Sequence, residues 1–343
     1  MSSRVPETKQ PNATAPRDLE SARAAVDALV QEIAKAIVGH DEIIKGVLVC
    51  LLCGGHALLE GVPGLGKTYL IKSLGEVMDL KTSRIQFTPD LMPADILGTN
   101  ILIQGEDNRR FIRFQPGPIF ANIVLADEVN RATPKTQSAL LEAMQEHAVT
   151  ISGRNYQLGS PFVVLATQNP IEMEGTYPLP EAQLDRFFFK LHVAYPTPSQ
   201  INQILNKTTK GSLPRLRKVL SGQQLNEMKQ LVKEVPIAEH VQDYAVRLTM
   251  ATQPSSQAST EMSRRYVRYG SSPRGAQSLV LAGKAAALLD GRYNVSCDDI
   301  RRAARPSLRH RIILNFEGEA ADITPEQIIE DLLEKTATVV ERT

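Results

Sequence analysis

The chain has 343 residues, which is enough for two domains that each bury a hydrophobic core. It carries 39 Lys and Arg against 38 Asp and Glu, and this formal net charge of +1 excludes a surface that is cationic throughout and recruits nucleic acid or an anionic membrane. Hydrophobic residues make up 42%, and we find neither a signal peptide nor an apolar run of membrane-spanning length, so we expect a cytoplasmic protein.

Helices and short apolar strands alternate up to about residue 193. Residues 1–18 are rich in Ser, Pro, Thr and Ala, and they predict a mobile tail. From the spacing of apolar residues we then predict helices at 19–36, 41–52, 69–78 and 134–146, and strands at 57–60, 84–87, 123–126, 162–166 and 188–193. This alternation predicts an α/β fold with a mainly parallel sheet and right-handed crossovers.

Two β-hairpins and a helical region complete the predicted pattern. The first hairpin pairs 101–103 with 111–114 around a polar tip, and the second pairs 148–151 with 156–158 around a turn at Ser152–Asn155. After Pro198 the β signal stops, and we predict helices at 200–208, 221–232, 239–253, 272–289, 297–308 and 325–336. A composition shift near Gly211 leads us to divide the chain into an α/β domain at 19–205 and an all-helical domain at 206–343.

The stretch Gly61-Val62-Pro63-Gly64-Leu65-Gly66-Lys67-Thr68 fits G-x-x-x-x-G-K-[ST], the phosphate-binding loop of nucleoside triphosphatases. Glycines let the backbone curl so that successive N–H groups face phosphate oxygens, and the helix that follows adds its positive end. Lys67 would reach the β- and γ-phosphates, and the Thr68 hydroxyl would bind Mg²⁺. A chance glycine-rich turn is the alternative, and the order of strand, loop and helix argues against it.

Two carboxylates, Asp127 and Glu128, follow the buried strand 123–126. Open α/β sheets bind their ligands at the carboxyl ends of their strands, where these side chains would lie. Asp127 would hold Mg²⁺, and Glu128 would polarise the attacking water. An Asp-Glu pair alone is typical of a solvated strand end. The position of this pair, about 60 residues after a phosphate loop, favours the functional interpretation.

Cys50 and Cys53 form a C-x-x-C pair, which can indicate redox or metal chemistry. Because they lie in an apolar helical run and no second pair accompanies them, we interpret them as buried packing residues. None of the six histidines lies in H-E-x-x-H, so we predict no zinc site.

Several segments together resemble the AAA+ ATPases, and within them the MoxR family. They are IVGH at 37–40, the phosphate loop, FTPDLMPADILG at 87–98, GPIF at 117–120, DEVNRA at 127–132, ATQNP at 166–170, PEAQLDRF at 180–187 and SPRG at 272–275. The resemblance covers about residues 20–340 and implies a nucleotide-binding α/β core followed by a helical lid domain.

The resemblance also implies roles for three polar residues. Asn169 is similar to sensor 1, which helps place the water, although an Asn before Pro170 is also a common turn residue. Arg186 is similar to the arginine finger that reaches a neighbouring subunit's site, and a surface ion pair with Asp185 is its alternative. Arg274 is similar to sensor 2, which contacts the nucleotide from the lid.

Other parts of the resemblance concern adenine and the hairpins. Ile37, Val38 and Gly39 are expected to lie against adenine, although a plain connection between two helices explains them nearly as well. Arg131 is either an interface residue or a charge at a helix start. The hairpins match the helix-2 insert and pre-sensor-1 insert of the branch that also contains magnesium-chelatase subunits and replicative helicases, so their tips are expected to face a ring pore or a partner.

The implied function is Mg²⁺-dependent ATP hydrolysis by a homo-oligomeric ring, expected to be a hexamer, that remodels client proteins. MoxR proteins act as chaperones, often with von Willebrand factor A domain partners and sometimes in metal insertion. A nucleic-acid motor or a chelatase-like subunit is the alternative, but Arg109 and Arg110 are offset by Glu106 and Asp107, so nucleic acid is an unfavoured partner. A non-hydrolysing scaffold would not require Glu128.

Overall fold

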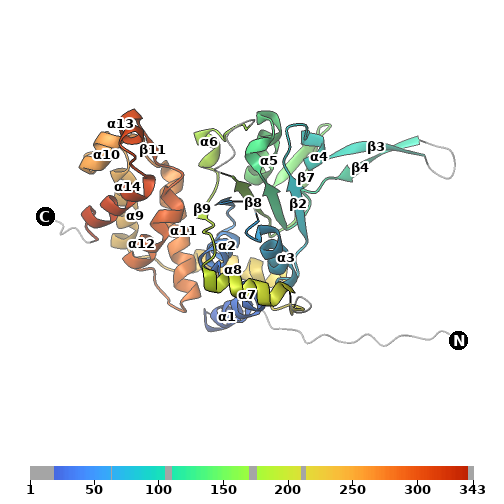
Figure 1. The fold of residues 1–343 in the computed structure, drawn as a ribbon, viewed down its shortest axis with the longest axis horizontal. Coiled ribbons are helices and arrows are strands. Elements are labelled where there is room, and N and C mark those ends of the chain that lie inside the picture. The colour runs from blue at the N-terminus through green and yellow to red at the C-terminus, as the bar shows by residue number, and fades with distance from the viewer. Residues whose placement is uncertain (1–18, 63, 105–109, 170–175, 210–213, 339–343) are drawn as a thin grey trace.

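The structure is a computed structural model that describes residues 19–62, 64–104, 110–169, 176–209 and 214–338 (Figure 1). The predicted tail, Pro63 of the phosphate loop, the tip of the first hairpin and the boundary near Gly211 lie outside these residues. In the described part, the helices α9 to α14 gather on one side of a central sheet, and a long hairpin projects on the other.

Two helices precede the first strand. Helix α1 (Leu19–Ala36) has the predicted bounds, and α2 (Asp41–Cys53) ends one residue later than predicted. Gly39 and His40 separate them with φ values of 72° and 63°, a left-handed conformation that no helix continues through. Strand β1 (Ala57–Glu60) follows, and α3 (Lys67–Val77) starts two residues earlier than predicted because the turn at Gly66 leads straight into it.

The central sheet has five parallel strands in the order β2, β5, β8, β1, β9, which confirms the predicted α/β fold. Besides β1 they are β2 (Thr82–Gln86), β5 (Ile123–Asp127), β8 (Val163–Gln168) and β9 (Phe189–His192). Because all five run the same way, their carboxyl ends share one edge, here the carboxyl edge, and their amino ends share the other, the amino edge.

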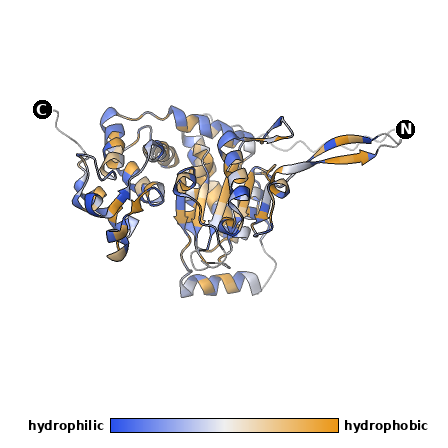
Figure 2. Ribbon diagram, turned by 90° about the horizontal axis from the view of Figure 1, so that it is seen from above, coloured by the Kyte–Doolittle hydropathy of each residue, from blue (hydrophilic) through white to orange (hydrophobic). Residues whose placement is uncertain are grey.

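Alternate residues of the central strands pack into separate cores on the two faces of the sheet. Leu59 and Leu165 pack with α1, α2 and α3 on one face. Leu58 and Val164 pack on the other face with α4 (Pro93–Leu97) and α5 (Pro134–Glu146), of which α5 has the predicted bounds. Figure 2 shows the strands as a hydrophobic centre between these helices. The two cores hold the loops at both edges in fixed positions.

Both predicted hairpins are present. The first consists of β3 (Gly98–Gln104) and β4 (Arg110–Pro116), which are longer than predicted and project from the body as an arm (Figures 1 and 2). On this arm the cross-strand pair Leu102 and Ile112 is 62% and 72% exposed. The second consists of β6 (Ala148–Ile151) and β7 (Arg154–Gln157), and its turn holds only Ser152 and Gly153 instead of the predicted four residues.

The remaining elements follow β5 and β8 in the chain. They are the short helices η1 (Val129–Arg131) and α6 (Glu181–Leu184), then α7 (Pro198–Thr209), α8 (Gly222–Glu234), α9 (Glu239–Ala251), α10 (Glu261–Tyr266), α11 (Pro273–Leu289), α12 (Cys297–Leu308), α13 (Phe316–Ala320) and α14 (Pro325–Lys335). The helical region is not wholly helical, because β10 (Val267–Tyr269) and β11 (Ile313–Leu314) form a two-stranded antiparallel sheet.

Three helices that follow α7 pack on the α/β core: α8 contacts α2, α11 contacts α1 and α2, and α12 contacts β9. The Ser272 hydroxyl accepts a hydrogen bond from the backbone N–H of Arg274 and caps α11 at the predicted start. In the described ranges, none of the helices combines the length and the apolar composition that a membrane crossing requires.

The cysteines of α2 lie in the interior as free thiols. Cys50 is buried and Cys53 partly buried, and burial raises the pKa of both thiols. Within the described residues, no group of three or more His, Cys, Asp or Glu side chains is arranged to hold a metal ion. The burial of the two thiols agrees with their interpretation as packing residues.

Candidate functional site

The predicted phosphate loop connects β1 to α3 at the carboxyl edge. Gly64 and Gly66 have φ values of 85° and 76°, and a Cβ on either would meet no atom within 4 Å. These glycines are therefore required by the backbone conformation rather than by lack of space. Helix α3 begins at Lys67, so its free N–H groups face the loop, as an anion site requires. The loop thus fits a phosphate group.

The Lys67 ammonium lies at this edge and donates a hydrogen bond to the carbonyl oxygen of Gly61 at 2.7 Å. Burial lowers the pKa of Lys67, and the carboxylates of Asp127 and Glu128 oppose that shift. These interactions bring the loop lysine and both predicted carboxylates, which are about 60 residues apart in the chain, into one electrostatic environment.

Asp127 ends β5 and has two partners. Its Oδ2 pairs with Arg84 Nη2 at 2.7 Å, and its Oδ1 accepts a hydrogen bond from Thr167 Oγ1 at 2.6 Å. With the Thr68 hydroxyl at the start of α3, the Asp127 carboxylate makes an all-oxygen donor pair, which suits Mg²⁺ bound jointly with phosphate oxygens. The residues present therefore fit that ion.

Glu128 follows in the left-handed conformation, with φ 58° and ψ 49°. Its N–H donates to Thr167 Oγ1 at 2.8 Å, so one threonine orients both acidic residues. Its carboxylate accepts a hydrogen bond from Gln86 Nε2 at 2.9 Å, and Arg131 Nε lies 3.3 Å from the same oxygen. Arg131, left open by the sequence, is therefore an ion-pair partner of Glu128.

Asn169 follows β8 and is 7% exposed. Strand β8 lies between β1 and β5, and the N–H of Gly61 donates to the carbonyl oxygen of Gln168. Asn169 is thus held at the carboxyl edge between the phosphate loop and Asp127, where a polar group can contact both a phosphate and a water.

The segment Ile37–His40 packs against the phosphate loop. His40 Nε2 lies 3.2 Å from the carbonyl oxygen of Leu65, so the turn and the loop are in direct contact. Ile37 is buried, Val38 is half-buried, and a Cβ on Gly39 would come within 2.7 Å of Gln200 Nε2. The turn therefore places apolar residues beside the loop, and the left-handed conformation of Gly39 favours glycine at that position.

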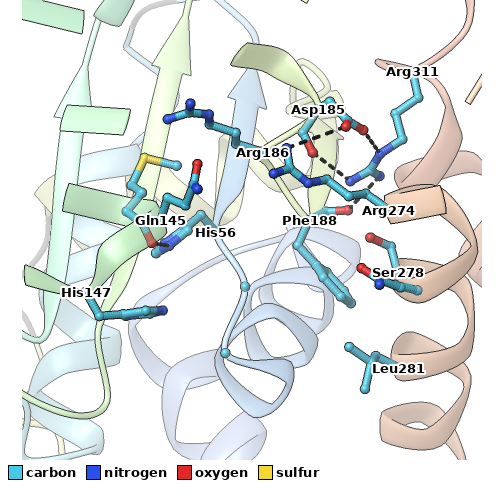
Figure 3. A pocket seen from close by; sticks show the side chains of 14 residues that line it. His56, Gln145, His147, Asp185, Arg186, Phe188, Arg274, Ser278, Leu281 and Arg311 are labelled. Atoms are coloured by element: carbon cyan, nitrogen blue, oxygen red, sulfur yellow. Dashed lines mark hydrogen bonds and ion pairs between the residues drawn. The ribbon is translucent and has the colours of Figure 1, made fainter. Parts of the chain in front are cut away.

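Arg186 and Arg274 lie at the amino edge instead. The N–H of Phe188 donates to the carbonyl oxygen of His56, which precedes β1, whereas the phosphate loop follows β1. A cavity of about 390 Å³ at this edge is lined by residues of the core and the helical region, among them His56, Gln145, Arg186 and Arg274 (Figure 3). Arg186 Nη1 donates to the carbonyl oxygen of Leu141 on α5 at 3.0 Å.

Asp185 is the acidic residue of this edge. It pairs with Arg311 Nε at 2.8 Å, accepts hydrogen bonds from Ser272 Oγ and lies 3.6 Å from Arg274 Nη1. No ion pair joins it to Arg186, whose guanidinium points away from the group in Figure 3. The surface ion pair considered as an alternative for Arg186 is not formed.

Sequence reasoning missed the residues that hold the acidic groups in place, namely Gln86, Arg84 and Thr167 at one edge and Arg311 at the other. Gln86 and Thr167 end or nearly end their strands, as Asp127 does. A polar residue at the carboxyl end of a buried parallel strand is the signal that could have found them.

Comparisons with known proteins agree with this geometry. Residues 56–189 match the ATPase family associated with various cellular activities (AAA), and residues 259–332 match the AAA lid domain. Chaperone MoxR1 of Mycobacterium tuberculosis is 42% identical over 306 residues, which are 89% of this chain and 80% of that protein. The chain belongs to the MoxR family of AAA+ ATPases. Protein MoxR of Methylorubrum extorquens is 30% identical, with 89% of this chain and 93% of that protein covered.

The chain is also similar to a solved structure. The crystal structure of a candidate ATPase from Cytophaga hutchinsonii has a TM-score of 0.87 and 41% identity, with 93% of this chain and 96% of that one covered. The helical region from α10 to α14 lies almost wholly within the matched AAA lid domain and is called the lid below.

Proposed function

We propose that this MoxR-family ATPase hydrolyses ATP with Mg²⁺ as a ring, expected to be a hexamer, in which one protomer binds the nucleotide and its neighbour completes the site. One observation carries the proposal. Lys67, Asp127 and Glu128 lie at the carboxyl edge of the sheet, whereas Arg186 and Arg274 lie at the amino edge. β1 alone separates these edges by about 13 Å, and this separation supports action of both arginines on a nucleotide held by another copy.

ATP binding would use the loop and the turn beside it. The loop N–H groups from Gly61 to Thr68 and the Lys67 ammonium would hold the phosphates, with the lysine moving from the Gly61 carbonyl oxygen to a phosphate oxygen. Ile37, Val38 and Gly39 would contact adenine, since they lie against the loop. The loop residues Pro63 and Leu65 belong to the same cradle by sequence, although Pro63 lies outside the described residues.

Hydrolysis would depend on groups that neutralise charge and place a water molecule. Thr68 and Asp127 would hold Mg²⁺, which when bound neutralises charge on the phosphates. Glu128 would orient and polarise the attacking water, and Asn169 would help to place it. Arg186 of the neighbouring protomer would stabilise the negative charge that develops on the transferred phosphoryl group.

Arg274 would act with Arg186 on the same neighbouring nucleotide, because the two arginines line one cavity. Since Arg274 starts the long helix α11, its contact with a nucleotide would link ATP binding to the position of the lid. ATP turnover would then become relative motion of core and lid, and through it remodelling of a cytoplasmic client protein. Von Willebrand factor A domain proteins are the first clients to test. Insertion of a metal into the client is one result that the remodelling would have.

Separate assays test the ATPase activity, the ring and the client. The purified chain should release phosphate from ATP only with Mg²⁺, and sedimentation should show a ring in the presence of ATP. Glu128→Gln, trapped with ATP, should retain the client in a pull-down. A monomer that hydrolyses ATP as fast as the ring would contradict the proposal, and a salt-sensitive rise in rate with DNA would favour the nucleic-acid motor instead.

A further inference from the structure

The segment that carries Arg186, residues 185–188 between α6 and β9, is hydrogen-bonded to the lid at several points. Ser272, His310 and Arg311 all bond to it. Ser272 Oγ donates to the Asp185 carboxylate, and His310 Nε2 lies 2.9 Å from the carbonyl oxygen of Phe187, to which it must donate. These contacts join parts of the chain more than 80 residues apart.

Arg311 makes most of these bonds. Its side chain is 2% exposed, and all three guanidinium nitrogens are used. Nε donates to the Asp185 carboxylate at 2.8 Å, and Nη2 donates to the carbonyl oxygens of Asp185 at 3.2 Å and Phe187 at 2.8 Å. Nη1 donates to the carbonyl oxygens of Phe188 at 3.3 Å and Ser307. A planar fork of donors is needed for this set, which a lysine cannot reproduce.

The side chain and the backbone of Arg186 have different partners. Its side chain contacts the core through the Leu141 carbonyl oxygen, while the backbone on both sides is held by Arg311 (Figure 3). The segment is also anchored in the core, because Phe187 is buried there and the N–H of Phe188 donates to the carbonyl oxygen of His56. Since Arg311 holds the same backbone from the lid, a shift of the lid relative to the core would act on the Arg186 backbone through Arg311.

We infer that Arg311 is a positioning residue for Arg186: through Asp185 and the carbonyl oxygens of the segment, it couples the position of the lid to the reach of Arg186 toward the neighbouring protomer's nucleotide. This inference rests on the proposed action of Arg186 on another protomer. Catalytic groups must be held within a fraction of an ångström of their working positions, and about 1 Å of displacement can cost roughly 100-fold in rate. Arg311 thus links a protomer's lid to hydrolysis in its neighbour.

The first test is Arg311→Lys, which keeps the charge and removes the fork. We expect kcat to fall about tenfold or more, while KM for ATP changes by less than about twofold, because ATP is bound by the unaltered loop. Arg305→Gln is the matched control, since Arg305 lies on α12 six residues before Arg311 and, among the described residues, forms a salt bridge only with the exposed Glu330. Thermal unfolding of both variants should stay close to that of the parent chain.

The second test uses mixed rings, prepared by co-expressing two differently tagged chains and purifying through both tags. Arg311→Lys protomers are combined with Glu128→Gln protomers, which retain an intact Arg186 but are expected to hydrolyse ATP about 100-fold more slowly than the parent chain. If Arg311 acts on the neighbour, Arg311→Lys protomers that receive a finger from Glu128→Gln protomers regain activity, and turnover per Arg311→Lys protomer rises toward about half of the parent value.

The outcomes separate the inference from the proposed function. An unchanged kcat in Arg311→Lys overturns the inference. The inference is also overturned if mixing with Glu128→Gln restores activity to Arg186→Ala protomers but not to Arg311→Lys protomers. If mixing does not restore activity to Arg186→Ala protomers either, then Arg186 does not act on a neighbouring protomer, and both the proposed function and the inference are rejected. If Arg311→Lys does not fold, Asp185→Asn replaces it, because it keeps the Arg311 bonds to backbone carbonyl oxygens. For Asp185→Asn we expect a smaller fall in kcat, and mixing with Glu128→Gln protomers should restore the activity. An unchanged kcat, or a fall that mixing does not restore, overturns the inference.

Discussion

The two edges of the central sheet hold their charged groups in different ways. At the carboxyl edge a ligand can replace the partners of the charged groups. Lys67 donates to a loop carbonyl oxygen, and Glu128 is paired with a glutamine and an arginine that are partly exposed. At the amino edge Arg311 is buried and every guanidinium nitrogen is bonded. One edge can accept a ligand by local rearrangement of side chains, whereas the other can change only if the lid moves.

Removing Arg186 tests whether the amino edge serves another protomer. For Arg186→Ala we expect a fall in kcat of about 10³-fold, because an arginine that neutralises charge on the transferred phosphoryl group is worth roughly that much. Steady-state phosphate release measures it, and mixing with Glu128→Gln protomers should restore turnover. Arg264→Ala, which removes an exposed arginine of the lid, is the control. Full activity in Arg186→Ala would remove the functional difference between the edges.

Glu128→Gln tests the carboxyl edge alone. The amide still accepts a hydrogen bond from Gln86, but it cannot polarise water, so we expect kcat to fall about 100-fold while ATP affinity is retained. Equilibrium binding of a fluorescent ATP analogue and phosphate release separate the two effects. Glu76→Gln, on the exposed side of α3, should change neither. Loss of binding together with turnover would give Glu128 a role in holding nucleotide instead.

The difference between the edges also explains what the sequence could predict. The phosphate loop and the Asp127-Glu128 pair are contiguous strings whose chemistry is local, and the alternation of strands and helices is enough to bring them to one edge. Thr167 and Gln86 were missed because their importance depends on the order β2, β5, β8, which periodicity does not specify. Arg311 and Asp185 are 126 residues apart, and nothing local indicates that they meet.

The small sheet of the lid was missed for a related reason. Strands β10 and β11 have three and two residues, too few for an alternating pattern to be recognised, and they pair across a long interval that includes α11 and α12. The longer helices were predicted within a few residues, because apolar residues recur at helical spacing along them and capping residues mark their starts. In α12, for example, Ser296 and Asp299 form a capping box at the first turn.

Acid should weaken the amino edge before the carboxyl edge. Burial lowers the pKa of His56 to about 4, and the neutral ring accepts from the N–H of Val164 and donates to the carbonyl oxygen of Met144. Below pH 6.5 the unfolded chain binds a proton that the folded chain excludes, so stability falls as pH falls. For His56 we expect a loss of about 2 kcal/mol between pH 6.5 and 5.

Urea unfolding at several pH values measures this slope, which His56→Gln should flatten. The buried His310, whose pKa burial also lowers, contributes with the same sign and remains in the variant. At the carboxyl edge burial alone would raise the pKa of Glu60, but hydrogen bonds from His192 and Lys190 bring it to about 2. Its contribution is lost only as pH falls below 4.5. An unchanged slope in His56→Gln would contradict a neutral His56.

The smallest expected effect concerns the hydroxyl that joins the two acidic residues. Thr167→Val keeps the shape of this buried side chain but leaves the N–H of Glu128 without its acceptor and Oδ1 of Asp127 without the threonine donor. We expect the free energy of unfolding to fall by about 1 kcal/mol and kcat to fall severalfold, since Glu128 is held in a left-handed conformation by this contact.

Thr249→Val is the matched control for that change. Thr249 is also buried, but its hydroxyl donates to the carbonyl oxygen of Ala245 one turn earlier in α9, within the helical region. That bond competes with no ligand, so Thr249→Val should leave kcat unchanged and alter stability by less than Thr167→Val. Equal falls in kcat for both variants would mean that the threonine acts on the fold as a whole. A fall confined to Thr167→Val would show that the carboxyl edge, for all its exchangeable partners, depends on one buried hydroxyl to align its two carboxylates.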